Sequence, residues 1–394
     1  MTNDRLPPSR LAARMRAIEP FHAMDVLSRA RELERQGRSI VHMEVGEPDF
    51  PTPRPVLDAA ARALAGGSLP YTEGLGLRPL REAIARFYRT RHGLEVSPER
   101  VVVTAGGSGA LLLAMGVLVE PGEEVLMADP SYPCNRQFVR VMGGEPRCLP
   151  VGPETRWQPT AELLERHWTA RTAAALVASP ANPTGTLIEP AELARIAALT
   201  EARGGALVVD EIYHGLTYGL DARTALELPG RVFVVNSFSK YFDMTGWRLG
   251  WLVAPPEYVR ELEKLQQNLY ICPSHLAQRA ALAAFEPATL EVLEARRGEL
   301  RARRDFLLPA LRELGFELPL VPEGAFYLYA GCGRLAEDSF AFALEILERA
   351  GVALTPGLDF GRHQPERHLR VSYTTSMEQL RVAVERLRGF LAAR

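Results

Sequence analysis

Residues 232–240 read Val-Phe-Val-Val-Asn-Ser-Phe-Ser-Lys, an apolar run that ends in polar residues and a lysine. A short run without polar alternation is typical of a strand buried on both faces of a parallel sheet. Similar runs occur at residues 101–103, 124–127, 173–178, 206–209 and 249–253, separated by helical patterns at 110–119, 190–203 and 257–267. This alternation predicts an α/β fold with a mainly parallel sheet covered by helices.

The pattern changes after about residue 285. The next stretch is charged and periodic over a length that predicts one long helix, residues 290–314, joining two domains. Shorter elements follow it, with strand-like pieces at 326–329 and 368–373 and helices at 339–350 and 377–393. This mixture indicates a smaller α+β domain.

The length of the chain also favours more than one domain, because 394 residues exceed a single ordinary core. We expect a large, ligand-binding domain at residues 51–285 and a small domain at 286–394. Residues 1–50 are expected to form an N-terminal arm that packs with the small domain.

Composition excludes several classes of protein. Lysine and arginine total 46 against 48 aspartate and glutamate, so no basic excess suggests nucleic acid or an anionic membrane as partner. The four cysteines lie far apart and the eight histidines lack metal-ligand spacing, so neither disulfides nor a metal site are expected. The N-terminus lacks an apolar signal segment, and no apolar run is long enough to span a membrane. These features predict a soluble, cytoplasmic protein.

Polar residues follow nearly every predicted strand, at the end where open α/β sheets bind ligands. Residues 104–109, Thr-Ala-Gly-Gly-Ser-Gly, open a helix and offer free N–H groups that suit a phosphate. Their spacing matches neither a dinucleotide fingerprint nor a P-loop, and a tight turn would also need glycine. Asn182 stands between Pro180 and Pro183, which restrict the backbone and so direct its amide. Each of these signals is weak alone.

Charged residues at the same strand ends strengthen the pattern. Asp210 ends an apolar run, where a carboxylate is costly unless it meets a cation. Lys240 and Arg248 follow another apolar run and need an anionic or electrophilic partner. The strand ends therefore predict one ligand with several chemically different groups.

Pyridoxal phosphate (PLP) satisfies all of these residues at once. Its phosphate suits the glycine-rich turn, Ser237 and Arg248, and its protonated ring nitrogen suits Asp210. Its aldehyde suits Lys240, and its phenolic oxygen suits Asn182 and Tyr213. PLP is therefore the expected cofactor.

The order and spacing of these motifs resemble one known family. Asn-Pro-Thr-Gly (182–185), Asp-Glu-Ile-Tyr (210–213), Ser-Phe-Ser-Lys (237–240) and Met-Thr-Gly-Trp-Arg-Leu-Gly (244–250) resemble the class I/II aminotransferases of the fold-type I PLP superfamily. The likeness covers nearly the whole chain. It implies a PLP-dependent transferase of fold type I, with an aminotransferase activity.

The resemblance implies catalytic roles for Lys240, Asp210 and Tyr213. Lys240 is similar to the lysine that binds the cofactor aldehyde as a Schiff base and then moves the proton from the substrate Cα. Asp210 is similar to the residue that keeps the pyridine nitrogen protonated. Tyr213 and Asn182 are similar to the residues that hydrogen-bond the phenolic oxygen of the ring.

Further contacts are implied by the same resemblance. The expected phosphate ligands are Gly107, Ser108, Ser237 and Arg248, and Tyr132 is expected to stack on the ring. Tyr71 is similar to a tyrosine that reaches the phosphate in the other subunit, which implies a homodimer with shared active sites. The expected substrate-binding residues are Gly46, Asn182 and Arg370. Alone, Arg370 would be interpreted as an outward residue on a strand, but in the family it clamps the α-carboxylate.

Two alternatives to aminotransfer remain open at this point. A carbon–sulfur β-lyase on the same cofactor also begins with removal of the Cα proton, and the motifs do not separate the two outcomes. A non-catalytic PLP-binding module is the other alternative, although the set of catalytic residues is complete.

The sequence gives fewer indications of the substrate than of the cofactor. A dicarboxylic amino donor needs a second cation, and no lysine or arginine matches that role by motif. The segment 18–24, which is expected to border the substrate pocket, is mainly apolar, and so is the stretch 269–273. We therefore expect a neutral or aromatic L-amino acid as donor and a 2-oxo acid such as 2-oxoglutarate as acceptor.

Overall fold

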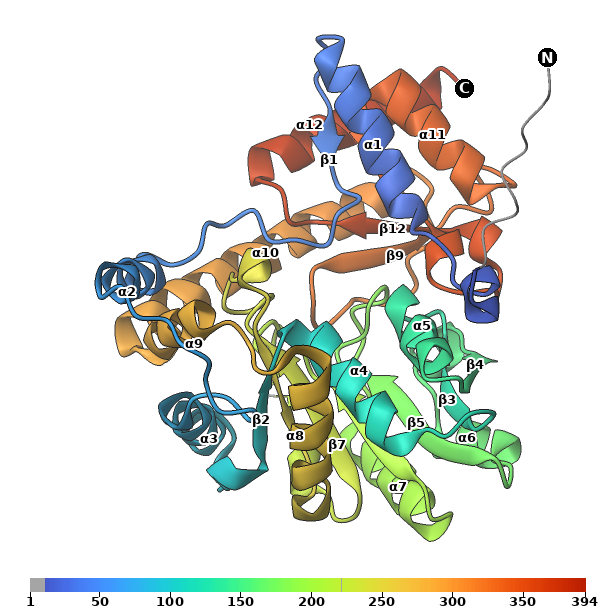
Figure 1. The fold of residues 1–394 in the computed structure, drawn as a ribbon. Coiled ribbons are helices and arrows are strands. Elements are labelled where there is room, and N and C mark those ends of the chain that lie inside the picture. Colours follow the sequence, from blue (N-terminus) through green and yellow to red (C-terminus); the bar gives the residue numbers. More distant parts are fainter. Residues whose placement is uncertain (1–10, 221) are drawn as a thin grey trace, which may run out of the picture.

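The computed structural model describes residues 11–220 and 222–394. Its centre is a seven-stranded sheet with helices on both faces (Figure 1). In spatial order the strands are β2 (Val101–Thr104), β8 (Gly250–Val253), β7 (Val232–Ser237), β6 (Ala206–Asp210), β5 (Thr172–Ala178), β3 (Glu124–Asp129) and β4 (Glu145–Pro150). The predicted mainly parallel α/β sheet is confirmed, including all six predicted strands.

The helices around this sheet begin and end close to the predicted limits where a prediction was made. They are α2 (Arg54–Ala65), α3 (Arg78–His92), α4 (Gly106–Leu118), α5 (Pro133–Val141), α6 (Ala161–His167), α7 (Pro190–Ala202), α8 (Pro256–Tyr270) and α9 (His275–Ala281).

Alternate residues of the strands build a hydrophobic layer on each face. Val208 belongs to the same cluster as Leu113 of α4 and Leu262 of α8. Its neighbour Val209 belongs to the other cluster, which includes Ile196 of α7. Successive strand residues point to opposite faces, so continuous apolar runs are what a sheet covered on both sides requires.

Strand β4 is an element that the sequence pattern did not predict. It pairs only with β3, at the edge of the sheet, and most of its residues are partly or fully exposed. It contains Pro146 and Pro150, and proline is tolerated in strands mainly at edges. An edge strand of this kind lacks the apolar run on which the prediction depended.

Strand β8 runs antiparallel to both of its neighbours, and this reversal builds the ligand site. Gly250 pairs with Thr104 at the carboxyl end of β2 and with Ser237 at the carboxyl end of β7. A Cβ atom at Gly250 would lie 2.8 Å from the nitrogen of Gly107. Glycine at position 250 therefore lets the start of α4 approach the turn that follows β7.

The rest of the chain surrounds a second, smaller sheet. The long helix α10 (Pro287–Glu313) leads to the antiparallel strands β9 (Tyr327–Gly331), β12 (His368–Ser372) and β11 (Thr355–Pro356). A parallel pair joins β1 (Val41–His42) to β10 (Val352–Ala353), and α1 (His22–Arg35) contacts α11 (Ser339–Ala350). Helix α12 (Met377–Ala392) ends the chain (Figure 1).

The division into residues 1–50, 51–285 and 286–394 stays a prediction. The pairing of β1 with β10 does place part of the first fifty residues against the C-terminal part of the chain. The first ten residues of the predicted arm lie outside the described residues. Within the described ranges, no helix combines the length and the apolar character needed to cross a membrane.

Candidate active site

A cavity of about 440 Å³ lies at the carboxyl ends of β5, β6 and β7. The opposite wall comes from β9 and β12, through Tyr327 and Arg370. Ten of the twelve predicted site residues line this cavity: Gly46, Gly107, Ser108, Tyr132, Asn182, Asp210, Tyr213, Lys240, Arg248 and Arg370. Residues from all parts of the chain therefore converge at the edge of the sheet where the sequence pattern placed them.

Lys240 lies three residues beyond the end of β7 and reaches across the cavity. Its Nζ donates a hydrogen bond to the carbonyl of Gly46 at 2.7 Å. Burial and the positive charge of Arg370 lower the pKa of Lys240 to about 8, against a smaller opposing effect of Glu47. A neutral amine, which is the nucleophilic form, is thus accessible near neutral pH.

Gly46 owes its place to a close approach. A Cβ atom at this position would lie 2.0 Å from the hydroxyl of Tyr327, so no other residue fits without a shift. The backbone of residue 46 can therefore lie in the cavity wall beside Lys240.

Asp210 ends β6 and is 6% exposed. Its Oδ1 accepts a hydrogen bond from the Ile212 N–H at 3.1 Å. Burial raises the pKa of Asp210 to about 6, although this hydrogen bond and the charge of Lys240 oppose the rise. Among the described residues, no cationic side chain forms an ion pair with it, so its carboxylate is suited to a cation supplied by a ligand.

Two tyrosines meet beside this carboxylate. The hydroxyl of Tyr213 lies 2.9 Å from that of Tyr327, and both side chains are buried. Burial raises the pKa of Tyr213 well above its usual value, so its hydroxyl keeps its proton and can donate it to a ligand oxygen.

Arg370 lies on β12 and is 6% exposed. Its Nη1 donates to Asn182 Oδ1 at 3.1 Å and its Nη2 to the Glu44 carbonyl at 2.6 Å. Its Cζ lies 4.4 Å from the ring centroid of Tyr327 and 4.9 Å from that of Phe360. Within the described chain no carboxylate pairs with it, which makes this guanidinium a receptor for an acidic group of a ligand.

The opposite end of the cavity combines a helix start with a second arginine. Helix α4 begins at Gly106, and no side chain caps its first N–H groups. Arg248 donates to the Thr245 carbonyl at 2.9 Å, and its Nη2 would lie 2.8 Å from a Cβ atom at Gly106. Free N–H groups at a helix N-terminus beside a guanidinium suit a phosphate.

Two predicted cofactor residues do not line the cavity. Ser237 is fully buried, and its Oγ lies 2.9 Å from Ser239 Oγ and 3.1 Å from the Leu249 carbonyl oxygen. Ser239 lines the cavity in its place. Tyr71 is 78% exposed on the surface of its own chain.

Several cavity residues were not predicted from the sequence. Tyr327, Ser239, Phe360, Asp359 and Glu44 all line the cavity. Ser239 and Glu44 flank predicted residues closely enough to have been considered. Tyr327 and Phe360 look like ordinary core aromatics in the sequence, and only the packing of β9 and the turn after β11 brings them to the site.

The comparisons with known proteins agree on one family. A model described as "Aminotransferase class I and II" matches residues 38–387. A valine–pyruvate aminotransferase from Mycobacterium tuberculosis is 40% identical over 376 residues, 95% of this chain and 97% of that protein. An aspartate/prephenate aminotransferase from Thermus thermophilus is 38% identical over 379 residues, 95% of this chain and 97% of that protein. The crystal structure of an aminotransferase from M. tuberculosis, 40% identical, matches with a TM-score of 0.94 over 98% of this chain and 100% of that one.

The chain belongs to the class I and II aminotransferase family. It is a PLP-dependent aminotransferase of fold type I, as the sequence motifs predicted. The cavity fits this cofactor in its chemistry. A buried carboxylate without a cation, an amine with a lowered pKa and an uncapped helix start beside Arg248 line one cavity.

Proposed function

We propose that this chain transfers the amino group of a neutral or aromatic L-amino acid to a 2-oxo acid, with Lys240 as its central catalytic residue. The observation that supports this most directly is the arrangement of Lys240. Its amine, with a pKa lowered to about 8, shares one cavity with the buried carboxylate of Asp210 and the unpaired guanidinium of Arg370.

When bound, PLP supplies an aldehyde for the exchange of amines and a ring that takes up electron density. In our proposal Lys240 holds the aldehyde end and, once released, accepts the proton that leaves the substrate Cα. Asp210 holds the protonated ring nitrogen, and Tyr213 and Asn182 donate hydrogen bonds to the phenolic oxygen. Arg370, with the backbone at Gly46, orients the α-carboxylate of the substrate.

The remaining cavity residues hold and enclose the cofactor. The N–H groups of Gly107 and Ser108 and the guanidinium of Arg248 bind the phosphate. Tyr132 covers the face of the ring. Ser237 acts indirectly, because its hydroxyl supports Ser239 rather than the cavity.

The choice of a neutral or aromatic donor rests on the lining of the cavity. Its three cationic residues, Lys240, Arg248 and Arg370, all have a role in binding the cofactor or the α-carboxylate. The lining near the N-terminal segment is mainly apolar, with Phe21 and Met24. Among the relatives, the valine–pyruvate aminotransferase is named for a neutral amino acid and the aspartate/prephenate aminotransferase for an acidic one, so the proposal rests on the cavity lining.

Half-reaction chemistry tests the reaction type. The PLP-loaded enzyme is mixed with an amino acid in the absence of an acceptor, and the products are measured. Transamination gives one equivalent of 2-oxo acid and leaves the cofactor aminated. Continuous release of ammonia would instead indicate a β-lyase and contradict the proposal.

A panel of amino donors, each assayed with one acceptor, tests the substrate class. We expect neutral and aromatic donors to have the highest kcat/KM. An aspartate kcat/KM more than a hundredfold above all of them, about 2.7 kcal/mol in transition-state stabilisation, would refute this part of the proposal.

A homodimer with shared sites is part of the same proposal. Tyr71 is exposed and does not line the cavity of its own chain, and Leu69 and Ile271 are exposed as well. The Thr72 N–H donates to the sulfur of Cys272 at 3.4 Å, so the two loops that carry these apolar residues lie together. A fully active monomer in sedimentation experiments would exclude the dimer. A cytoplasmic location is also proposed, and the four unpaired cysteines suit a reducing compartment.

A further inference from the structure

Five arginines of the described chain are buried, and they divide into two groups. Arg81, Arg303 and Arg304 each form an ion pair with at least one carboxylate. Arg136 and Arg370 form none within the described ranges. A buried cation without an anionic partner is costly, so an unpaired arginine calls for an anion from outside the chain. Arg370 has such an anion in the α-carboxylate, which leaves Arg136 to be explained.

Arg136 lies on α5 and is 7% exposed. Its Nη2 donates to the carbonyl of Asp359 at 3.0 Å, whereas its Nη1 is buried without any hydrogen-bond partner. A carbonyl satisfies one donor but carries no net charge. Within the described ranges the guanidinium therefore retains a free donor and has no carboxylate at ion-pair distance, although Glu19 and Asp359 line the same small cavity.

The position of Arg136 connects it to the active site. Asp359 and the next residue, Phe360, both line the main cavity, and Arg370 lies over the Phe360 ring. Arg136 bonds Asp359 and Arg370 packs on the adjacent Phe360, whose Cα atom is about 3.8 Å from that of Asp359. The two unpaired arginines therefore contact the same two-residue segment. A small cavity of about 20 Å³ lined by Arg136 shares Phe21, Pro133 and Asp359 with the main cavity.

Residues that line both cavities thus stand between Arg136 and the substrate space. They include part of the N-terminal segment, which the Asp359 carboxylate holds by accepting hydrogen bonds from the His22 and Ala23 N–H groups at 2.7 and 2.8 Å. Phe21 lines both cavities. A shift of Phe21 would join the two spaces and expose the free Nη1 donor to a substrate.

We propose that Arg136 is a specificity-determining residue that binds the second carboxylate of a dicarboxylic 2-oxo acid acceptor. This inference rests on the proposed function, because it requires the α-carboxylate to lie at Arg370. It also resolves a difficulty of that proposal: 2-oxoglutarate carries a second charge, for which the main cavity has no spare cation. A neutral donor fills the apolar part of the cavity and leaves Arg136 behind Phe21.

The test compares two acceptors in the same PLP-loaded enzyme. We expect Arg136→Gln to lower kcat/KM for 2-oxoglutarate about a hundredfold and that for pyruvate less than threefold. Arg136→Lys should restore part of the activity with 2-oxoglutarate. Arg140→Gln is the matched control, because Arg140 lies one turn further along α5, bonds only uncharged oxygens and should leave both values unchanged.

Binding of an unreactive diacid gives a second readout that is independent of turnover. Calorimetry on the PLP-loaded enzyme should find glutarate at least tenfold tighter than valerate, and Arg136→Gln should remove this difference. Equal loss with both acceptors, an unchanged acceptor ratio, or no preference for glutarate in the unmodified enzyme would overturn the role of Arg136. An enzyme that transfers amino groups to pyruvate but not to 2-oxoglutarate would overturn it as well, while leaving the reaction type intact. If neither acceptor is aminated, the proposed function itself fails.

Discussion

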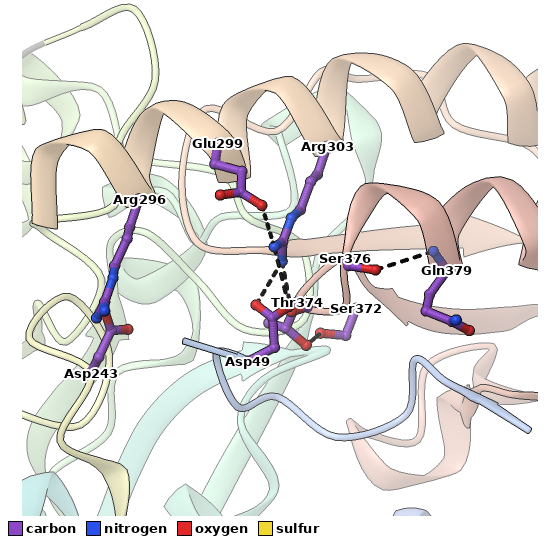
Figure 2. A network of polar contacts seen from close by, with 9 residues as sticks. All are labelled: Asp49, Asp243, Arg296, Glu299, Arg303, Ser372, Thr374, Ser376 and Gln379. Atoms are coloured by element: carbon purple, nitrogen blue, oxygen red, sulfur yellow. Dashed lines mark hydrogen bonds and ion pairs between the residues drawn. The ribbon is translucent and has the colours of Figure 1, made fainter. Parts of the chain in front are cut away.

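Helix α10 and the active-site cavity both bury arginines, but with opposite surroundings. On α10, Arg303 is 1% exposed and meets Asp49 through two contacts of 2.8 and 3.1 Å, with Glu299 beside it (Figure 2). Seven residues, or about two turns, earlier on the same face of α10, Arg296 pairs with the buried carboxylate of Asp243 at 2.7 Å. The charges of this network are balanced within the chain.

In and beside the cavity, by contrast, the hydrogen bonds of Arg370 and Arg136 end on neutral groups. Arg370 bonds the amide of Asn182 and a backbone carbonyl, and Arg136 bonds another carbonyl. Both guanidinium groups retain a buried atom without a partner. A complete ion pair holds the fold together, whereas an incomplete one costs stability until a ligand completes it.

The largest effect in the cavity is expected for Lys240→Ala. Without the amine, the cofactor loses its covalent anchor and the Cα proton loses its acceptor, so kcat should fall by several orders of magnitude. The absorbance of the bound cofactor should change as well. Lys264→Ala, an exposed lysine on α8 paired with Glu261, is the control and should behave like the unmodified enzyme. Normal turnover of the Lys240 variant would show that this cavity is not the active site.

Asp210→Asn should also slow the reaction by several orders of magnitude but leave the fold intact. The amide cannot keep the ring nitrogen protonated, so removal of the Cα proton becomes slow. Because burial raises the pKa of this carboxyl to about 6, replacing its charge should not lower the stability of the PLP-free protein at pH 7. The measurement is the single-turnover rate, and a loss below tenfold, about 1.4 kcal/mol, would contradict the assigned role.

Parallel substitution of Arg370 and Arg303 sharpens the comparison between the two regions. Arg370→Gln should reduce kcat/KM about a hundredfold or more, while the PLP-free protein keeps or gains stability, since an unpaired buried charge disappears. Arg303→Gln should lower the free energy of unfolding by about 1–3 kcal/mol, less than for a fully buried pair because Asp49 and Glu299 are partly exposed. Denaturant unfolding and steady-state kinetics on both variants decide the matter. Equal losses of stability in the two variants would contradict the view that Arg303 stabilises the fold and Arg370 does not.

The smallest effect concerns pH. In the PLP-free protein, the rate at which Lys240 attaches PLP should rise with pH to a midpoint near 8 and then level off, since only the neutral amine reacts. An ordinary lysine would continue to titrate to above pH 10. Arg370→Gln removes a charge that lowers the pKa of Lys240, so the midpoint should move to higher pH. Between pH 8 and about 10 the unfolded chain binds more protons at this residue, so its contribution to stability increases with pH in that window.

Much of the site could be predicted because the relevant signals are local. Asp210 ends one apolar strand and Lys240 follows another, and parallel strands bring their carboxyl ends to one edge of the sheet. Ser237 shows the limit of this reasoning. Its place in the motif suggested a phosphate ligand. In the structure Ser239, two residues further along the turn, lines the cavity, and Ser237 lies behind it in contact with its hydroxyl.

Only the tertiary structure decided which charges have partners. The sequence alone determined the α/β layering, the chemistry of the strand ends and the choice of PLP, because these depend on periodicity and on short motifs. It did not determine the reversal of β8, the contact of Tyr213 with Tyr327 or the isolation of Arg136. Arg136 and Asp359 are 223 residues apart, and Arg303 and Asp49 are 254 apart. Nothing in the neighbouring residues marks one arginine as paired and the other as free, because the balance of charge in a protein interior is set by side chains that only folding brings together.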